Sequence, residues 1–281
     1  MAQRIRRIAE KTMTTGALIF AFNNKEIDYV SLARWCAGNV RRHLGIPVCL
    51  VTDSQDQDLS GFDQAICIGP VSLGIANQRY FSDYNTNVVW HNTTRSDVYN
   101  LTPWERTLVL DADYVVASDQ LKLLLDADLD FLAHKDGYDV TGLNNFEDLN
   151  SFGRNWMPMW WATVMMFRKS KQAELIFSTM QMVRDNWQHY RNLYGISQST
   201  FRNDFALSIA LGIVNGHTLD HPSIPWNLAS LTPDQKLTQL DTDRYRVEFV
   251  TPDNKSRYIE LHQDFHAMGK KQLGEIVANQ S

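Results

Sequence analysis

Two aspartates, Asp111 and Asp113, stand two positions apart inside the apolar run over residues 108–116. The apolar flanks are rich in β-branched residues, which is typical of a buried strand. Residues two apart in a strand face the same side, so the two carboxylates would point together. Such a pair suits Mg²⁺ or Mn²⁺, above all a metal shared with substrate phosphates. A capped turn is the commoner explanation of an isolated D-x-D, but the buried run favours a ligand site at the sheet edge.

A second group of residues with chemical potential comes late, where His262 and His266 precede Gly269 and Lys270. An imidazole can complete the ligand shell of a metal, and a lysine can neutralise phosphate. A glycine lets the backbone approach an anion closely. We favour His266 as the ligand because it lies closer to Gly269 and Lys270, and the choice between the two histidines stays open at this stage.

Arg95 and the Asn203-Asp204 pair have both a structural and a chemical interpretation. Arg95 precedes the aspartate strand and is either a solvated surface cation or a residue of the site. Asn203 and Asp204 stand at the start of a predicted buried helix, where N-capping is their simplest role. A carboxylate at this position can also accept hydrogen bonds from the hydroxyl groups of a ligand.

Strands and helices alternate with short connections, which predicts an α/β fold with a central, mostly parallel sheet flanked by helices. The expected strands cover residues 16–22, 47–52, 65–68, 108–116, 130–134, 161–168, 245–250 and 258–261. The expected helices cover residues 27–44, 93–101, 118–125, 171–193, 205–214 and 272–277. Gly45 is expected to end the first helix, Asn92, Thr93 or Thr94 to cap the second, and Ser118 or Asp119 to cap the third.

One long stretch, residues 135–159, has no clear periodicity, and loops of this length in compact domains are usually functional or disordered. Its aromatic content argues against disorder. Trp156, Trp160 and Trp161 cluster with methionines near its end. Such residues usually pack in a core, although an exposed tryptophan would offer a stacking face to a sugar or a base.

Composition limits the class of protein. Hydrophobic residues make up 44% and charged residues 21%, as in ordinary globular proteins, and the net charge of −5 argues against coating of nucleic acid. Cys36, Cys49 and Cys67 lack metal-ligand spacing and indicate core positions in a reducing compartment. No apolar run approaches the roughly 20 residues that span a bilayer. We therefore expect a cytoplasmic protein without membrane contact, with a basic arm over residues 1–15 and one domain over residues 16–281.

The order of these features resembles that of GT-A fold glycosyltransferases, most closely the retaining group that includes glycogenin and galactosyltransferases. The shared features are an Asn-terminated first strand, an Arg-bearing helix, a strand ending Leu-Asp-Ala-Asp, an Asp-containing later helix and a late His-Gly-Lys segment. The resemblance extends over about residues 16–271. It implies a Rossmann-like GT-A fold. It also implies transfer of a sugar from a nucleoside-diphosphate sugar, expected to be a UDP-sugar, to an acceptor hydroxyl with retention of configuration.

The resemblance further implies roles for individual residues. Asp111, Asp113 and His266 would bind Mn²⁺ or Mg²⁺. The metal, with Arg95 and Lys270, would stabilise the charge on the leaving diphosphate. The residues expected to act on the donor sugar are Arg95, Asp136 and Asp204. The residues expected to contact the nucleotide donor are Phe22, Asn23, Asn24, Tyr29, Arg95, Asp111, Ala112, Gly269 and Lys270.

Three segments depart from the family's pattern. Residues 161–163 read Trp-Ala-Thr in place of Asn-x-Gly, and residues 203–205 read Asn-Asp-Phe in place of an Asp-Gln pair. The late His-to-Lys spacing is also shorter than usual. These changes fall mostly on the sugar and acceptor side. The acceptor is therefore left as a glycan, a protein or, as for similar phage-encoded proteins, a modified DNA base, and the oligomeric state stays open.

Two other functions remain as alternatives. A haloacid-dehalogenase-like phosphatase also has a D-x-D after an apolar strand, with Asp111 as nucleophile and Asp113 as acid/base. That family places the pair on its first strand, whereas the strands expected over residues 16–22, 47–52 and 65–68 precede it here. A nucleotide-sugar-binding protein without turnover is the non-enzymatic alternative. The sequence contains no P-loop, G-x-G-x-x-G, G-x-S-x-G or H-E-x-x-H motif.

Overall fold

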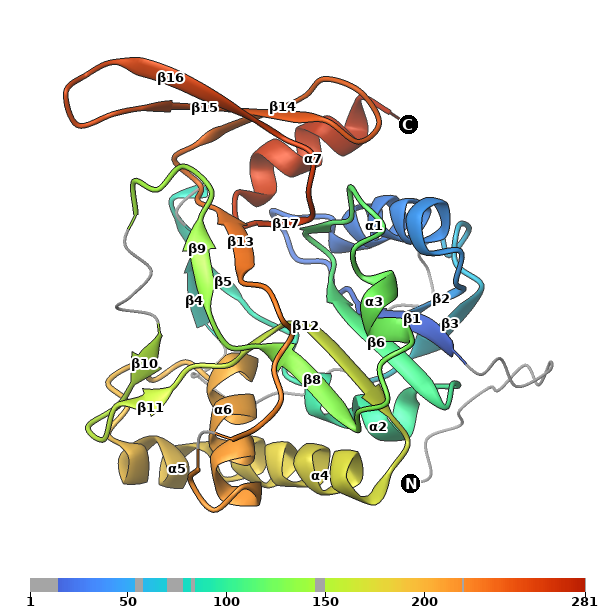
Figure 1. Ribbon diagram of the computed structural model, residues 1–281, viewed down its shortest axis with the longest axis vertical. Helices are drawn as coiled ribbons and strands as arrows, with labels where there is room; N and C mark the ends of the chain where they lie inside the picture. Colours follow the sequence, from blue (N-terminus) through green and yellow to red (C-terminus); the bar gives the residue numbers. More distant parts are fainter. Residues whose placement is uncertain are drawn as a thin grey trace.

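The computed structural model describes residues 15–53, 58–69, 78–81, 84–144, 150–218 and 220–280. Figure 1 shows a mixed α/β arrangement with a central sheet between groups of helices. Residues 1–14 of the predicted basic arm lie outside the described residues, and Thr15 already belongs to the first strand.

The central sheet has six strands in the order β3-β2-β1-β6-β12-β8. Strands β3, β2, β1 and β6 run parallel, and β12 is antiparallel to both of its neighbours. The predicted α/β fold with a mostly parallel sheet is therefore confirmed. The strand bounds are β1 (Thr15–Phe20), β2 (Val48–Thr52), β3 (Gln64–Cys67), β6 (Arg106–Asp111), β8 (Phe131–His134) and β12 (Trp161–Arg168).

The central strands of this sheet are largely apolar because both faces are covered. In β1, Ala17 and Ile19 belong to one core cluster, whereas Leu18 and Phe20 belong to another. The first cluster includes residues of α1 (Tyr29–Leu44) and α7 (Lys270–Ala278), and the second includes those of α4 (Lys171–Asp185). Figure 1 shows α1 and α4 on opposite sides of the sheet. Burial on both faces explains the continuous hydrophobic runs.

Local signals set the two ends of α1. The Asp28 carboxylate accepts a hydrogen bond from the Ser31 N–H at 3.0 Å, which caps the first turn. Gly45 adopts a left-handed φ of 68°, and its N–H donates to the Arg41 carbonyl at 3.0 Å. The predicted end of this helix at Gly45 is confirmed.

A second sheet, which we did not predict, brings the late part of the chain beside the aspartates. Its order is β7-β17-β13-β9, with β7 directly after the aspartates and β17 carrying His266. The strands have two to four residues, which is too short for an alternating pattern to stand out. The strand bounds are β7 (Tyr114–Val115), β9 (Gly137–Asp139), β13 (Leu228–Leu231) and β17 (Phe265–Ala267).

The long helix predicted over residues 171–193 is two helices, α4 and α5 (Trp187–Tyr194), which meet at Asn186. The Asn186 side chain donates to the Met182 carbonyl at 2.9 Å and competes there with helical pairing. The next helix, α6 (Asn203–Val214), begins two residues earlier than predicted. None of the described helices has the length and apolarity to cross a bilayer.

The two short predicted helices also differ from expectation. The expected helix over residues 118–125 is only α3 (Lys122–Leu125), and neither Ser118 nor Asp119 caps it. The Ser118 hydroxyl instead donates to Asp264 at 2.8 Å, a contact between distant parts of the chain. Residues 93–101 begin as a 3₁₀ turn, η3 (Arg95–Asp97), and continue as α2 (Val98–Leu101), with no side-chain cap on either.

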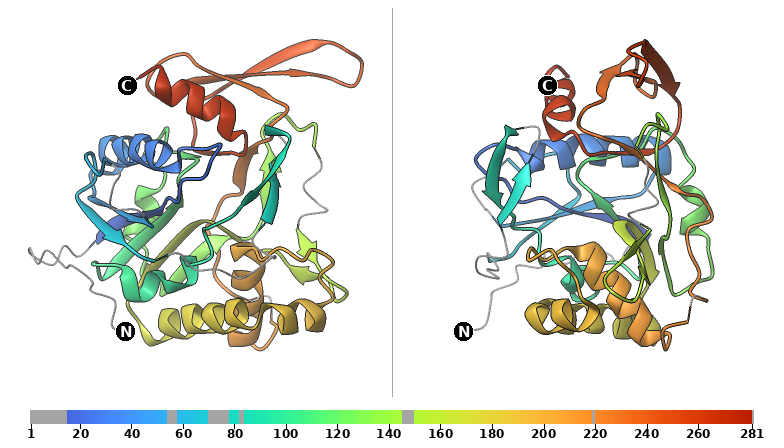
Figure 2. Two further views of the ribbon diagram at one scale, coloured as in Figure 1. Left: turned by 180° about the vertical axis from the view of Figure 1, so that it is seen from behind. Right: turned by 90° about the vertical axis from the view of Figure 1, so that its left-hand side faces the viewer.

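Short hairpins form over residues 78–81 with 86–89 and over residues 151–152 with 157–158, and the tail forms a three-stranded sheet. Strands β14, β15 and β16 are antiparallel, and Figure 2 shows the β15–β16 hairpin extending beyond α7. The bounds are β4 (Gln78–Phe81), β5 (Thr86–Val89), β10 (Ser151–Phe152), β11 (Met157–Pro158), β14 (Lys236–Gln239), β15 (Tyr245–Val250) and β16 (Ser256–Leu261).

The predicted burial of the tryptophan cluster and of the cysteines is right for some of these residues and wrong for others. Trp160 and Trp161 are buried, whereas Trp156 is 79% exposed, so the core interpretation is right for two of the three tryptophans. Cys36 and Cys49 are buried as predicted. Cys67 is exposed, contrary to prediction, because it ends the edge strand β3.

Two buried histidines are expected to make the stability depend on pH. Burial lowers the pKa of His134 to about 4, although His134 Nδ1 donates to the Trp226 carbonyl, and burial also lowers the pKa of His221 to about 4. The unfolded chain, with its usual pKa near 6.5, therefore binds more protons than the native state between pH 6.5 and 4. Between pH 7.5 and pH 5, each histidine should lower the free energy of unfolding by about 2 kcal/mol.

Urea denaturation at these two pH values checks this expectation. His134→Gln and His221→Gln should each reduce the loss of stability at pH 5, whereas the exposed His189→Gln should leave it unchanged. An undiminished loss in both buried variants would contradict the assignment.

Candidate functional site

The two aspartates lie where β6 ends. Asp111 is the last residue of β6, and Asp113 lies in the turn before β7, so the strand ends between the two acids. The expected alternation within one strand is therefore wrong, but the turn still brings the carboxylates together. One ligand atom from each of Asp111, Asp113 and His266 lies within 4.8 Å of the other two.

Strand pairing places His266 in this group. His266 pairs with Tyr114 across β17 and β7, and the Ala267 N–H donates to the Asp113 carbonyl at 3.0 Å. As a result, His266 Nε2 lies 3.4 Å from Asp113 Oδ2. His262 lies outside this group, exposed after β16, so the geometry favours His266 over His262 as the ligand.

The carboxylate of Asp113 is buried and held by two basic side chains. Lys270, the first residue of α7, places its Nζ 2.5 Å from Asp113 Oδ2, and it also donates to the Met268 carbonyl at 3.2 Å. Burial by itself raises the pKa of Asp113, but the charges of Lys270 and His266 and their hydrogen bonds outweigh it. The net result is a pKa far below the usual range, so the carboxylate is ionised at neutral pH.

Arg95 is buried rather than on a solvated surface, which corrects one of its two interpretations. It is 2% exposed, forms an ion pair with Asp111, and donates to the Ala162 carbonyl of β12. The turn that carries it is anchored by Arg184, which pairs with Asp97 at 2.7 Å. Arg95 thus connects β6 with β12 at the edge of the site, and Asp97 of the same turn connects it to α4.

The start of α6 forms the opposite side of the site. The N-cap position is Arg202, and Asn203 and Asp204 already lie in the first turn, so their predicted N-cap role is wrong. Asp204 instead accepts hydrogen bonds from the Ala162 N–H at 2.9 Å and from Arg202 at 2.7 Å. Asn203 donates to the Asn92 carbonyl at 2.9 Å. These contacts tie α6 to β12.

A cavity of about 290 Å³ joins these groups. The predicted site residues that line it are Phe22, Asn24, Tyr29, Arg95, Asp111, Ala112, Asp113, Asp204, His266 and Lys270. Asn23, Asp136, Gly269 and His262 are not among its lining residues. The Asn23 side chain bonds to Val30 N–H and Asp28, Asp136 is exposed before β9, and Gly269 is the N-cap residue of α7.

The cavity also contains residues that the sequence analysis did not select. Trp90, His91 and Asn92 reach it from the segment before η3, and Arg202 reaches it from the start of α6. Pro233 and Met268 reach it from the connections after β13 and β17. No local pattern marks these positions, because contacts between distant segments bring them to the site, such as the pairing of β13 with β17 and the bond between Asn203 and Asn92.

Comparison with known proteins gives distant structural similarity. No protein-family model matches the sequence, and no curated protein matches it. The chain is similar to the glycosyltransferase GlyE of Streptococcus pneumoniae, with 14% identity and a TM-score of 0.44, over 76% of this chain and 46% of GlyE. It is also similar to the galactosyltransferase LgtC, solved with donor and acceptor sugar analogues, with 15% identity and a TM-score of 0.45.

The similarity to LgtC covers 69% of this chain and 70% of LgtC. TarS of S. aureus gives 13% identity and a TM-score of 0.35, over 70% of this chain and 55% of the TarS chain. This chain spans about half the length of GlyE. At this degree of similarity, the function has to be argued from the site itself.

Proposed function

We propose that this chain is a metal-dependent glycosyltransferase of the GT-A type, which moves a sugar from a nucleoside-diphosphate sugar to an acceptor hydroxyl. One observation supports the proposal most: Asp111, Asp113 and His266 meet within 4.8 Å in one cavity, beside Lys270 and Arg95. Anionic ligands for a metal and cations for a diphosphate are thus combined at the end of a central strand. Ligands bind at this edge in open α/β sheets.

The donor set fits a divalent ion. Asp111 and Asp113 offer hard oxygen ligands, which both Mg²⁺ and Mn²⁺ accept, and the imidazole of His266 favours Mn²⁺. His266 Nε2 faces Asp113, so this nitrogen is the atom positioned to bind. A bound ion would supply Lewis-acid stabilisation of the negative charge that builds up on the leaving diphosphate.

Two cations of the chain would contribute to the same stabilisation. Lys270 is the first residue of α7 and lines the cavity, where its ammonium group lies beside the carboxylate of Asp113. Arg95 is fixed by its bonds to Asp111 and Ala162 and cannot swing away. Because both groups are held before the donor binds, little reorganisation is needed when charge develops.

The start of α6 would hold the donor sugar. The Asn203 side chain is buried, and its Oδ1 has no hydrogen-bond partner among the described residues, so it can accept from a sugar hydroxyl. Both oxygens of Asp204 already accept hydrogen bonds, which suits positioning rather than nucleophilic attack. We therefore propose transfer without a protein nucleophile, and we propose retention of configuration from the resemblance of the sequence to the retaining GT-A group. Asp136 is left out of this set because its exposed side chain does not line the cavity.

The end of β1 would hold the nucleotide base. Phe22 and Tyr29 offer aromatic surface in the cavity, and the Asn24 side chain accepts from the Glu26 and Ile27 N–H groups at 2.9 Å. We propose UDP as the nucleotide. A glycan, a protein or a modified nucleobase remains the proposed acceptor.

A donor screen tests the proposal. Tm is measured with UDP-, GDP- and dTDP-sugars in the presence of Mn²⁺ or EDTA, because a bound donor stabilises the native state by mass action. Release of the nucleoside diphosphate is then followed with the donor that raises Tm most. We expect a rise in Tm and a slow donor hydrolysis that both need Mn²⁺. Hydrolysis of p-nitrophenyl phosphate with no response to any nucleotide-sugar would favour the phosphatase, and donor binding without turnover would favour the binding protein.

A further inference from the structure

A second cavity, of about 870 Å³, lies apart from the catalytic residues, between the C-terminal half of α1, strand β14 and α7. We call it the amide groove, because its lining includes the side-chain amides of Asn39, Gln239, Gln272, Asn279 and Gln280. None of its lining residues lines the catalytic cavity. Its volume lies within the range of small-molecule binding sites.

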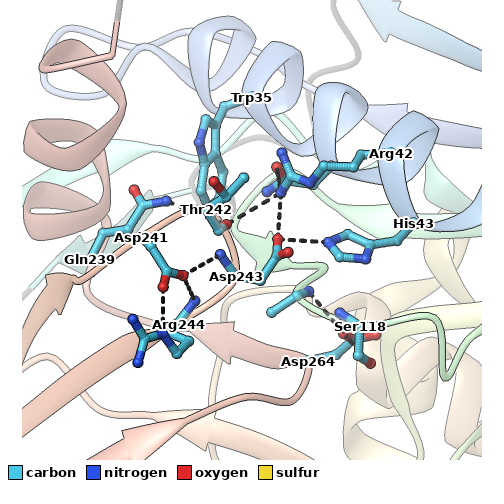
Figure 3. Close-up of polar contacts among 12 residues, drawn as sticks. Trp35, Arg42, His43, Ser118, Gln239, Asp241, Thr242, Asp243, Arg244 and Asp264 are labelled. Atoms are coloured by element: carbon cyan, nitrogen blue, oxygen red, sulfur yellow. Dashed lines mark hydrogen bonds and ion pairs between the residues drawn. The ribbon is translucent and has the colours of Figure 1, made fainter.

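The charged groups of the amide groove balance one another. The two cations that line it, Arg42 and Lys236, are matched by the two anions Asp241 and Glu275. Arg42 pairs with Asp243 at 2.9 Å, and Lys236 pairs with Glu248 at 2.8 Å. Figure 3 shows the Arg42 and Asp241 networks at this face, where Asp241 also holds Arg244. Because three of these four charges already have partners, the groove offers little free charge and favours a neutral ligand.

One buried amide in the groove lacks a partner. Asn39 is 3% exposed, and its Oδ1 accepts a bond from Arg42 at 2.9 Å. Its Nδ2 has no hydrogen-bond partner among the described residues, although this atom is buried. Buried polar groups are nearly always hydrogen-bonded, so an acceptor atom of a ligand would complete this residue.

The remaining lining suits a carbohydrate better than an extended peptide. A peptide would add to the free edge of β14, but the Leu237 N–H on that edge already donates to Gln272 at 2.7 Å. Apolar surface from Leu240 and Ile276 lies between the amides, where the C–H face of a sugar ring can pack. The unpartnered Nδ2 of Asn39 can donate to a sugar hydroxyl, whereas the amides of Gln272 and Gln280 already form hydrogen bonds within the chain.

We propose that the amide groove is a second ligand site, which binds a neutral oligosaccharide independently of metal and nucleotide. The catalytic cavity and the groove lie along one chain segment, because Pro233 lines the first and Lys236 the second. A glycan held in the groove would therefore stay close to the catalytic cavity.

Native affinity electrophoresis without metal or nucleotide tests this proposal. The gels contain glycogen, xylan or galactomannan as neutral probes, and heparin or alginate as anionic probes. Asn279→Arg places a long cation across the groove at an exposed position. Asn155→Arg adds the same charge on the exposed turn between β10 and β11 and is the matched control. Asn39→Leu removes the unpartnered amide and keeps a side chain of similar size.

We expect at least one neutral polysaccharide to slow the wild-type chain, the Asn155→Arg control and the Asp113→Asn variant alike. Asn279→Arg and Asn39→Leu should each weaken this binding by at least tenfold. If Asp113→Asn abolished the retardation, the binding would belong to the catalytic cavity and the proposal would be overturned. Retardation only by the anionic probes, or by none, would overturn it as well. Failure of the proposed glycosyl transfer would leave these outcomes unchanged, because no donor is present.

Discussion

Asp113→Asn is expected to reduce metal-dependent donor hydrolysis by about a thousandfold or more. The substitution keeps the volume of the side chain but removes a buried anion that contacts both Lys270 and His266. The amide binds a divalent ion less well than a carboxylate, and Lys270 loses the partner that holds it at 2.5 Å. Release of the nucleoside diphosphate, followed by chromatography at saturating Mn²⁺, measures the effect.

The matched control for this variant is Asp119→Asn, which removes a carboxylate from the surface only a few residues later. The Asp119 side chain is 73% exposed and pairs loosely with Lys122 at 3.7 Å. Its activity should equal that of the wild type. If Asp113→Asn also kept the wild-type rate, the metal assignment would be wrong.

Arg95→Met is expected to cost both stability and activity. The Arg95 side chain is 2% exposed and its partner Asp111 is 22% exposed, so removal of the guanidinium leaves a largely buried carboxylate without its counter-charge. Breaking such a pair on one side costs on the order of 3–5 kcal/mol of unfolding free energy. Loss of one preorganised cation at the diphosphate should reduce turnover by about a hundredfold or more.

The effect of Mn²⁺ on the stability of the Arg95→Met variant tests whether Asp111 is a metal ligand. If Asp111 is a metal ligand, a bound cation supplies part of the charge that Arg95→Met removes, and Mn²⁺ should stabilise the variant more than the wild type. Urea denaturation with Mn²⁺ and with EDTA measures this difference. Arg202→Met removes the cation that pairs with Asp204 on the other side of the cavity and serves as control, because its stability should not respond to Mn²⁺ in this way. Equal responses of all three chains would rule out Asp111 as a ligand.

The sequence predicts best those features that depend on near neighbours. The central strands were recognisable because both of their faces are buried, which leaves long apolar runs such as 108–110. The C-terminal end of α1 could be predicted because Gly45 adopts the left-handed backbone conformation that glycine tolerates best. The aspartate pair was found because a buried strand leads directly into it.

Long-range contacts account for what the sequence did not predict. Arg95 looked like a surface cation because its partners, Asp111 and the Ala162 carbonyl, come from two later strands. Asp204 looked like a helix cap because its bond to the Ala162 N–H crosses 42 positions of the chain. The β7–β17 pairing that selects His266 joins segments about 150 residues apart, and strands of two or three residues carry no periodic signal.

The proposed glycosyl transfer requires that Asp111, Asp113 and His266 bind Mn²⁺. Electron paramagnetic resonance reports free Mn²⁺, so a titration of the protein gives the number of bound ions and their affinity. We predict one Mn²⁺ site per chain, tighter when UDP is present, with binding lost in Asp113→Asn and retained in Asp119→Asn. A chain that binds no Mn²⁺ with or without UDP, or an Asp113→Asn variant that binds it as the wild type does, would contradict the central claim.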